Sequence, residues 1–146
     1  METLPFEIAE TAHALRRAFD RRASSLGVTR AQWKVMFRLN RTPGLRQVEL
    51  ADLLDVEPIT LCRIVDRLEE AGLVERQRDP ADRRAWKLRL TKAAEPLVTK
   101  LHALAEGFSA DVFADLDPAE IERARVLLGS IRNNLSGMAP RTKASA

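Results

Sequence analysis

The sequence lacks most of the residue types and motifs on which small enzymes and secreted domains depend. Its 146 residues include one cysteine, two histidines and no tyrosine. A single cysteine excludes an internal disulfide and a zinc site built from cysteines. The sequence also has no phosphate-binding glycine motif, no metalloprotease histidine pair and no Gly-x-Ser-x-Gly motif. We therefore expect no enzymatic activity and no cofactor.

Long apolar runs are absent as well. No segment approaches the roughly 18 apolar residues that a membrane-spanning helix needs. The stretch Met1–Pro5 carries Glu2 and is followed by no apolar core, unlike a signal peptide. We therefore expect a cytoplasmic protein that does not contact a membrane. A hydrophobic fraction of 45% with 31% charged residues predicts a single globular domain over residues 1–146.

Two short helices joined by a tight turn are predicted between residues 47 and 71. The first helix, Gln47–Leu54, has one apolar face. The turn begins at Asp55, a residue type that tolerates the left-handed conformation. The second helix begins at Pro58, because proline fits the first helical turn, and ends before Gly72, a typical C-terminal signal.

The second of these helices has a buried stripe and a polar outer surface. Its apolar residues at helical spacing are Leu61, Ile64, Val65 and Leu68. Its outer face and one flank carry Ile59, Thr60, Arg63 and Arg67. Arginine can bind guanine, threonine can bond to base edges and an apolar group can contact a thymine methyl, so this surface suits a major groove. The same pattern also fits an ordinary amphipathic helix with a solvated charged face.

A basic hairpin follows, with strand-like alternation over residues 73–78 and 85–90 and a loop over residues 79–84. From Arg76 to Lys92 there are seven basic and two acidic residues, a net charge of +5, whereas the rest of the chain sums to −2 within a total of +3. Such concentrated positive charge is typical of a phosphate-binding surface. Two adjacent arginines in the loop suit a narrow minor groove. A solubilising edge hairpin is the alternative.

This part of the chain resembles the MarR family of winged-helix transcription regulators. The resemblance rests on the run TLCRIVDRLEEAGLVER over residues 60–76, on DPADRR over residues 79–84 and on Leu90-Thr91. The Thr-Leu-x-Arg start at Thr60 and the Ala-Glu-Pro-Leu after the wing resemble the SlyA branch of the family. The sequence departs from the family at Arg46, where serine or threonine is usual, and at Asp55, where glycine is usual.

The resemblance covers roughly residues 6–136. It implies a mainly α fold with a small β-hairpin wing, that is, a winged helix-turn-helix module with a helical dimerisation region. It further implies a homodimer that binds double-stranded DNA at a palindromic operator and is often modulated by a small aromatic ligand.

We expect DNA contacts from the second motif helix, the start of the first and the hairpin. The candidate residues are Gln47, Pro58, Ile59, Thr60, Arg63, Arg67, Asp82, Arg83, Arg84 and Lys87. Arg63 is expected to contact a base and Arg84 to reach the minor groove. Asp82 is expected to hold a neighbouring arginine in position through its carboxylate. The core of this module is expected to comprise Leu50, Leu54, Leu61, Leu68, Leu73 and Trp86.

Helices with apolar seams are predicted at both ends of the chain, over residues 7–23, 91–115 and 118–135. They have little to bury against within one chain, so a twofold dimer that covers the seams is expected, with an intrachain antiparallel bundle as the alternative. In this division residues 5–26 and 92–136 form the dimerisation helices. Residues 30–90 form the winged-helix module, and residues 137–146 form a flexible tail.

A small aromatic or acidic effector is expected between the dimerisation helices and the module. The candidate residues, which offer rings and a cationic rim, are His13, Arg17, Trp33, Met36 and Phe37. In the alternative interpretation Trp33 and Phe37 are core residues and Arg17 is a surface charge.

Two isolated features have weaker functional interpretations. His102 and Glu106 lie four residues apart and could share a metal ion, but such pairs more often form a solvated helix face. Cys62 could act as a redox switch or could be a small residue beside the core.

Three classes of function remain open: a dimeric transcription regulator, a winged-helix module that binds protein or RNA, and a small helical enzyme. Salt-dependent binding to duplex DNA distinguishes the first class from the other two.

Overall fold

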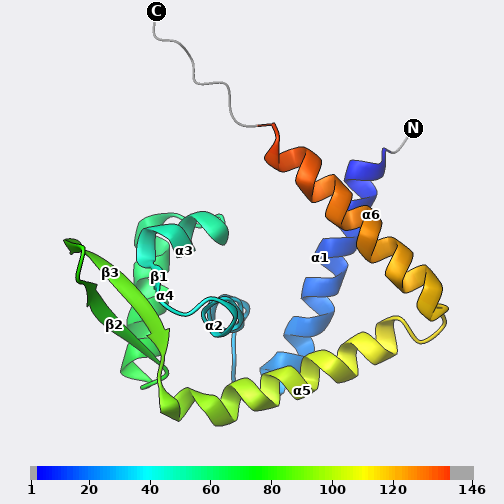
Figure 1. Ribbon diagram of the computed structural model, residues 1–146. Coiled ribbons are helices and arrows are strands. Elements are labelled where there is room, and N and C mark those ends of the chain that lie inside the picture. The colour runs from blue at the N-terminus through cyan, green and yellow to red at the C-terminus, as the bar shows by residue number, and fades with distance from the viewer. Residues whose placement is uncertain (1–2, 139–146) are drawn as a thin grey trace, which may run out of the picture. The chain divides into compact units, whose positions relative to one another are not determined.

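The structure is a computed structural model that describes residues 3–138 of the chain (Figure 1). Its helices are α1 Leu4–Ala23, α2 Arg30–Arg41, α3 Gln47–Leu53, α4 Pro58–Glu70, α5 Glu95–Val112 and α6 Pro118–Ser136, with 3-10 turns at Ser24–Leu26 and Lys92–Ala94. Its strands are β1 Leu45–Arg46, β2 Val74–Asp79 and β3 Asp82–Leu90. The predicted fold class, mainly α with a small β wing, is confirmed. Most of the predicted tail, residues 139–146, lies outside the described residues.

The chain divides into two compact units, Met1–Phe108 and Ser109–Ala146. The first unit has one continuous apolar core, to which helices α1 to α5 and the sheet all contribute. The predicted stripe of α4 supplies Leu61, Val65 and Leu68, each fully buried, while Ile64 is half-buried. Burying a leucine or valine side chain stabilises a fold by about 1.5–3 kcal/mol, so this stripe holds α4 in place.

Helices α1 and α2 are joined by a polar anchor as well as by apolar contacts. Asp20 on α1 accepts hydrogen bonds from Trp33 Nε1 at 2.8 Å and from Arg30 Nε at 2.6 Å. Burial alone would raise the pKa of Asp20, but these bonds and the charge of Arg30 outweigh it, so the pKa lies below its usual value. Thr29 caps the start of α2, because Thr29 and Gln32 exchange side chain-to-backbone hydrogen bonds.

The helix-turn-helix has the predicted local geometry. Asp55 adopts a left-handed conformation with φ 51°. Pro58 opens α4 in its first turn, and Gly72 follows α4 with φ 75°. Each of these positions was predictable because its residue type suits the local backbone conformation.

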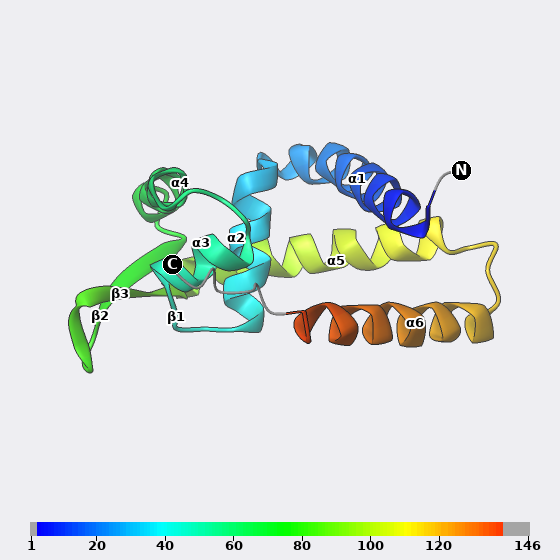
Figure 2. The ribbon, with the colours of Figure 1, turned by 90° about the horizontal axis from the view of Figure 1, so that it is seen from above.

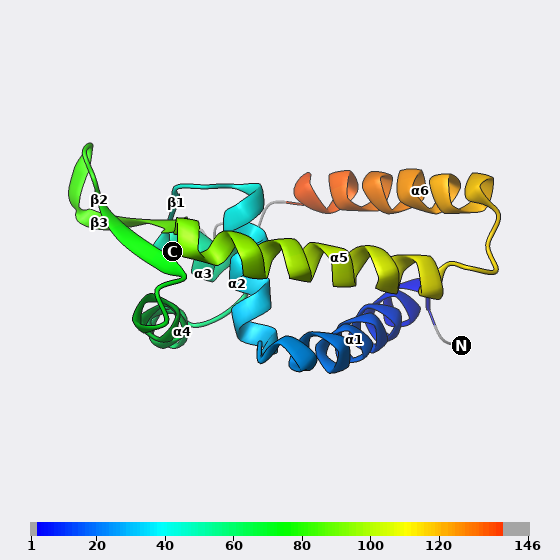
Figure 3. The ribbon, with the colours of Figure 1, turned by 90° about the horizontal axis from the view of Figure 1, so that it is seen from below.

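The sheet corrects two expectations. Its strand order is β1-β3-β2, all antiparallel, and β1 was not predicted at all. Residues 79–84 do not form a six-residue loop: β2 continues to Asp79, β3 starts at Asp82, and only Pro80 and Ala81 lie between them. The Asp79 carboxylate accepts the Ala81 N–H at 2.9 Å, and a strand irregularity at Arg78/Asp79 lets the strands close on this short turn. In Figures 2 and 3 the hairpin extends away from α2 and α3, with its turn at the tip.

Trp86 was expected in the core of the module, and this expectation is wrong. Its side chain is 39% exposed, whereas Leu88, two residues further along the same face of β3, is fully buried. The difference follows from position along the strand, because Leu88 pairs with β1 beside the helices while Trp86 lies nearer the projecting turn. The guanidinium of Arg78 lies over the Trp86 ring, 5.1 Å from its centroid.

Between β3 and α5 the chain forms the 3-10 turn Lys92–Ala94 before the α-helix begins at Glu95, next to Pro96. This irregular start agrees with the expected effect of a proline near the helix start. Within residues 3–138, no helix combines the length and the apolarity needed to cross a membrane.

The second unit contains α6, whose N-terminus is capped by two acidic side chains. Asp117 accepts the Ala119 N–H at 3.3 Å, and Glu120 accepts the Asp117 N–H at 3.4 Å. None of the described residues of α6 is buried. Its large exposed apolar residues are Val126, Leu127, Leu128 and Leu135.

Candidate nucleic-acid interface

Helix α4 exposes most of the side chains that the sequence assigns to base contacts. Ile59 is 65% exposed, and Thr60, Arg63 and Arg67 are also exposed. The buried leucines and valine on the opposite face fix the rotation of the helix about its axis. The outward residues are therefore presented by a rigid element rather than by a loop.

Arg76 on β2 fastens the wing to α4, a role that the sequence did not reveal. Its side chain is 15% exposed and donates to Asp66 Oδ1 at 2.7 Å and to Glu69 Oε1 at 3.1 Å. It also donates to the Cys62 carbonyl at 3.3 Å and to Gln47 Oε1 on α3 at 3.2 Å. Arg76 therefore joins three elements, and two carboxylates balance its charge.

The acidic neighbours of Arg76 raise its pKa. Burial alone would lower the pKa of Arg76, but the hydrogen bond to Asp66 and the charges of Asp66 and Glu69 outweigh burial, so its pKa is raised. Gln47, a candidate for DNA contact, uses its side-chain carbonyl within this network.

Asp79 is a second anchor that the sequence did not reveal. Its side chain is only 3% exposed, and its Oδ2 accepts from Arg46 Nε at 3.0 Å and from Arg46 Nη2 at 2.8 Å. Lys87 Nζ lies 4.0 Å from Oδ1. The Ala81 N–H, followed by Arg46 and Lys87, lowers the pKa of Asp79. The signal available in the sequence was Arg46 itself, which stands where the related family has serine or threonine.

Asp82 lies at the other side of the turn and has a different partner from the one expected. Its Oδ1 accepts the backbone N–H of Arg84 at 3.0 Å. Among residues 3–138, the wing carboxylate that pairs with an arginine side chain is that of Asp79. Asp82 therefore shapes the backbone that carries Arg84 instead of holding a guanidinium.

Two groups can be distinguished among the basic residues of this region. Arg46, Arg76 and Lys87 lie within 4.0 Å of carboxylates. The second group is exposed and, within the described part of the chain, has no acidic partner: Arg63, Arg67, Arg83 and Arg84. Exposed cations on α4 and at the start of β3 can pair with phosphates or base edges without first breaking an internal ion pair.

A groove lies where β3, the start of α3 and the start of α4 meet, and we call it the wing groove. Its volume is about 200 Å³, and it is lined by Arg46, Gln47, Val48, Pro58, Arg84, Ala85 and Trp86. Three of these, Gln47, Pro58 and Arg84, are candidate residues for DNA contact, so the groove belongs to the candidate interface.

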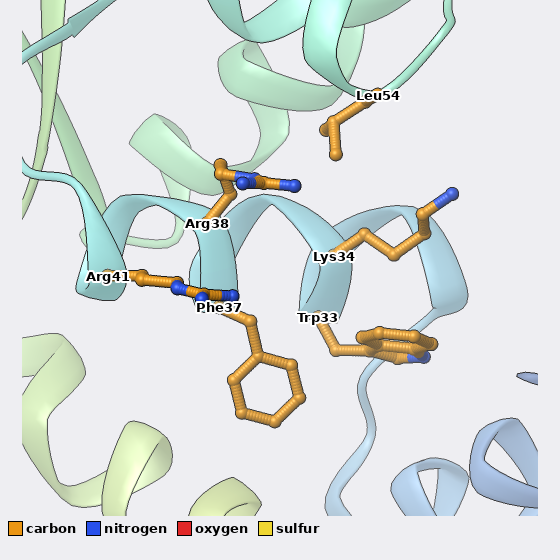
Figure 4. Close-up of a pocket in the computed structure, with 6 residues that line it drawn as sticks. All are labelled: Trp33, Lys34, Phe37, Arg38, Arg41 and Leu54. Atoms are coloured by element: carbon orange, nitrogen blue, oxygen red, sulfur yellow. The ribbon is translucent and has the colours of Figure 1, made fainter. Parts of the chain in front are cut away.

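A second hollow, of about 190 Å³, lies on α2. Figure 4 shows the rings of Trp33 and Phe37 on one side of the helix, while Lys34 and Arg38 reach toward Leu54. Arg41 completes the lining. Two rings beside three cations can accept an aromatic ring and a carboxylate. The cations Lys34, Arg38 and Arg41 are spaced four and three residues apart on one helix, a pattern that is visible in the sequence.

The predicted effector residues are not all brought together. Trp33 and Phe37 line this α2 hollow, but Met36 is 1% exposed and belongs to the core. His13 and Arg17 are exposed on α1 and line neither this hollow nor a neighbouring one formed by α1, α2 and α5. The two rings therefore share one hollow, in which the neighbouring cations are those of α2.

The two isolated features have structural partners. His102 Nε2 lies 2.9 Å from Asn40 Nδ2, and no cluster of three metal-ligating side chains occurs among residues 3–138. Cys62 is half-buried, with its sulfur 3.7 Å from Arg76 Nη2.

Comparisons with known proteins agree with this fold. A sequence model of the MarR family matches residues 28–86. The crystal structure of the transcriptional regulator PA3341 is 36% identical with a TM-score of 0.83, and the match covers 92% of this chain and 99% of that one. Wild-type MarR from E. coli, in its apo form, is 26% identical with a TM-score of 0.80, over 90% of this chain and 98% of that one.

A MarR family transcriptional regulator from Listeria monocytogenes, crystallised with a 26mer DNA, shares the fold. It is 21% identical with a TM-score of 0.80, over 94% of this chain and 91% of that one. Taken with the wing motif and the helix-turn-helix geometry, these matches establish that the chain belongs to the MarR family of transcriptional regulators. It carries the DNA-binding winged helix of that family.

Proposed function

We propose that this protein regulates transcription as a homodimer that binds a palindromic operator in double-stranded DNA. The observation that carries the proposal is the division of its basic residues. Arg46 and Arg76 are held internally, while Arg63, Arg67, Arg83 and Arg84 are exposed without acidic partners in residues 3–138. Within this proposal Arg63 contacts a base in the major groove, and Arg84 contacts the minor groove or its phosphates.

The remaining candidate residues take supporting roles in the proposal. Pro58, Ile59 and Thr60 lie at the exposed start of α4, where a recognition helix approaches base edges. Arg83 adds charge beside Arg84, and Asp82 shapes the backbone between them. Gln47 and Lys87 are half-buried at the edge of this surface, so we assign them contacts with the DNA backbone.

The homodimer is supported by the apolar surface of α6. Leu128 is 42% exposed and Leu135 is 60% exposed, although both belong to an apolar seam. A second copy of the chain that covers this seam would remove about 25 cal/mol of unfavourable hydration per Å² of apolar surface. Residues 5–26 and 92–136 would then form the dimerisation region and residues 30–90 the winged-helix module.

One experiment tests the operator and the dimer together. Purified protein should select, from random or genomic fragments, sequences that contain an inverted repeat. The centres of the half-sites should lie about 10–10.5 base pairs apart, or a multiple of that spacing, so that both α4 helices meet the same face of the duplex. Selection of single, unrepeated sites by a protein that sediments as a monomer would contradict the proposal.

We further propose that a small aromatic acid modulates this binding and that the chain belongs to the SlyA-like branch. The α2 hollow supports the effector, with Trp33 and Phe37 as ring contacts and Lys34 and Arg38 as partners of the carboxylate. The Thr60-Leu61-x-Arg63 sequence supports the branch. An effector can act only by binding the free and DNA-bound forms with different affinities.

Calorimetric titration of salicylate-like acids, with and without the selected operator, tests the effector. By linkage, the operator should weaken effector binding by the same factor as the effector weakens operator binding. Arg38→Ala should reduce binding of the acid, whereas Arg17→Ala should not, because Arg17 lies outside the hollow. Binding that is equal in the two titrations would remove the α2 hollow as a control site. Within this proposal the protein acts in the cytoplasm, where it binds its operator DNA.

A further inference from the structure

The wing groove places exposed apolar side chains next to cations. Trp86 is 39% exposed and Val48 is 62% exposed, and both line the groove with Pro58. Arg46 and Arg84 line the same groove. Contact between large apolar side chains and water is unfavourable, so a partner that covers these side chains would be stabilised by their burial.

The indole of Trp86 contacts Arg78 but retains an N–H that can donate a hydrogen bond to a ligand. Arg78 lies over its ring at 5.1 Å from the centroid, and Arg78 and Trp86 face each other across the β2-β3 ladder. Within residues 3–138, no hydrogen-bond partner is found for the indole N–H. A preorganised aromatic ring with an open N–H donor can therefore bind a ligand that offers both an apolar surface and an acceptor oxygen.

The chemistry of the groove matches a sugar-phosphate strand. Deoxyribose presents an apolar face, and the adjoining phosphate presents anionic oxygens that accept hydrogen bonds. The apolar wall of the groove can cover the former, while Arg84 and the indole N–H can donate to the latter. The location agrees with this match, because the groove is lined both by Pro58 at the start of α4 and by Arg84 of the wing.

We propose that the wing groove receives one strand of duplex DNA, with the Trp86 indole packed against a deoxyribose and its N–H donating to the neighbouring phosphate. The inference rests on the proposed DNA binding and adds a contact that carries no charge. Such a contact increases affinity for every sequence equally, because sugar and phosphate are the same at each step. It also leaves the salt dependence unchanged, because that slope follows the number of phosphates neutralised by cations.

A direct test uses Trp86 as its own reporter. In the Trp33→Phe protein Trp86 is the sole tryptophan, so its emission and its quenching by acrylamide report on the groove. Binding to mixed-sequence duplex DNA is followed in parallel by fluorescence anisotropy of a dye on the DNA. The emission of Trp86 should change and acrylamide should lose access as the duplex saturates. Unchanged emission and access in the saturated complex would overturn the proposal while leaving DNA binding intact. Absence of duplex binding by the unmodified protein would overturn both.

Substitutions test the energetic role of the groove. Trp86→Ala should weaken binding to the operator and to mixed-sequence duplex by the same factor, about tenfold, as expected for loss of a central aromatic contact. The slope of log affinity against log salt should not change. Trp86→Phe should retain part of the affinity, which distinguishes a ring contact from loss of wing structure. Equal affinities of the alanine variant and the unmodified protein would overturn the contact.

A matched pair of charge substitutions on α3 tests the location. Val48→Asp places a carboxylate in the groove, whereas Leu53→Asp places the same charge on an exposed residue of the same helix outside it. Val48→Asp should weaken duplex binding at low salt at least several-fold more than Leu53→Asp does. Equal weakening by both variants would show only an effect of net charge and would contradict the assignment of the groove.

Discussion

Helices α4 and α6 both carry apolar seams, but they use them differently. In α4 the seam residues Leu61, Val65 and Leu68 are fully buried within a single chain. In α6 none of the described residues is buried, and Leu128 and Leu135 remain exposed. The comparison shows that α4 is held by apolar contacts within its own chain, whereas the apolar residues of α6 remain exposed, and the proposed dimer would cover them with a second copy.

Removal of α6 should have the largest effect on the oligomeric state and on operator binding. A chain truncated before Asp117 should lose dimerisation and tight operator binding together, because the two α4 helices would no longer be linked. The α4 core should remain, so the far-ultraviolet circular dichroism should still show the helices of the first unit. Sedimentation measures the oligomeric state, and a truncated chain that remains dimeric would contradict the assignment of the seam.

Truncation of an apolar side chain should lower stability at every protein concentration when the residue lies on α4, but mainly at low concentration when it lies on α6. Leu61→Ala should lower the free energy of unfolding by about 2–5 kcal/mol at any protein concentration, because it leaves a cavity inside the chain. Leu128→Ala should instead weaken the dimer, so its effect on thermal unfolding should grow as the protein is diluted. A concentration-independent loss in the Leu128 variant would place that residue in an intrachain core.

Arg63→Ala should weaken binding to the selected operator by about 1–3 kcal/mol and relax discrimination at one base pair in each half-site. The buried stripe of α4 is unaffected by this change, so the fold should be retained. Competition binding with single-base operator variants measures both effects. Equal losses on operator and mixed-sequence DNA would show that Arg63 contacts phosphate alone.

Arg84→Ala should have a smaller effect, mainly on salt dependence. The slope of log affinity against log salt should fall by roughly one, as for loss of one phosphate contact. Trp86→Ala, which removes no charge, is the matched control in the same groove. A slope that stays constant in the Arg84 variant would show that its guanidinium does not neutralise a phosphate.

The pH dependence of stability should show the smallest effect, through Asp79. Because the folded-state pKa of Asp79 is lowered from 3.8, its contribution is fully present above that value and is lost as the pH falls through the folded-state pKa. The difference in urea stability between the unmodified protein and Asp79→Asn should therefore shrink as the pH decreases below about 4. Asp52→Asn, which removes an exposed carboxylate from α3, provides the control. A constant difference across this range would show that the charge of Asp79 has no role in stability.

Local signals in the sequence predicted the helix-turn-helix well. Asp55, Pro58 and Gly72 each meet a requirement set by the backbone of their own turn, so no distant residue was needed. The strand β1 was missed because a strand of two residues is too short to show an alternating pattern in the sequence. It is recognised as a strand only because Leu45 pairs with Leu88. Its existence depends on a partner more than forty residues away.

The sequence indicated the residue types of the candidate site but not the surroundings of each side chain. Alternation placed Trp86 on the same face as Leu88 but gave no information on how far each lies from the covering helices. Arg76 was counted as part of the basic surface because the sequence does not show that Asp66 and Glu69 reach it. In the same way, Met36 follows the apolar pattern of α2 but faces the core instead of the hollow.

The two anchors of the wing restrict how the protein can transmit a signal. Arg76 ties β2 to α3 and α4, and the Arg46–Asp79 pair ties the start of α3 to the end of β2. With attachments at both ends of β2, the hairpin and the two helices have few internal degrees of freedom and should displace as one body. A ligand that changes operator affinity would then alter the distance or the angle between two such bodies in a dimer, and would leave the geometry within each one intact.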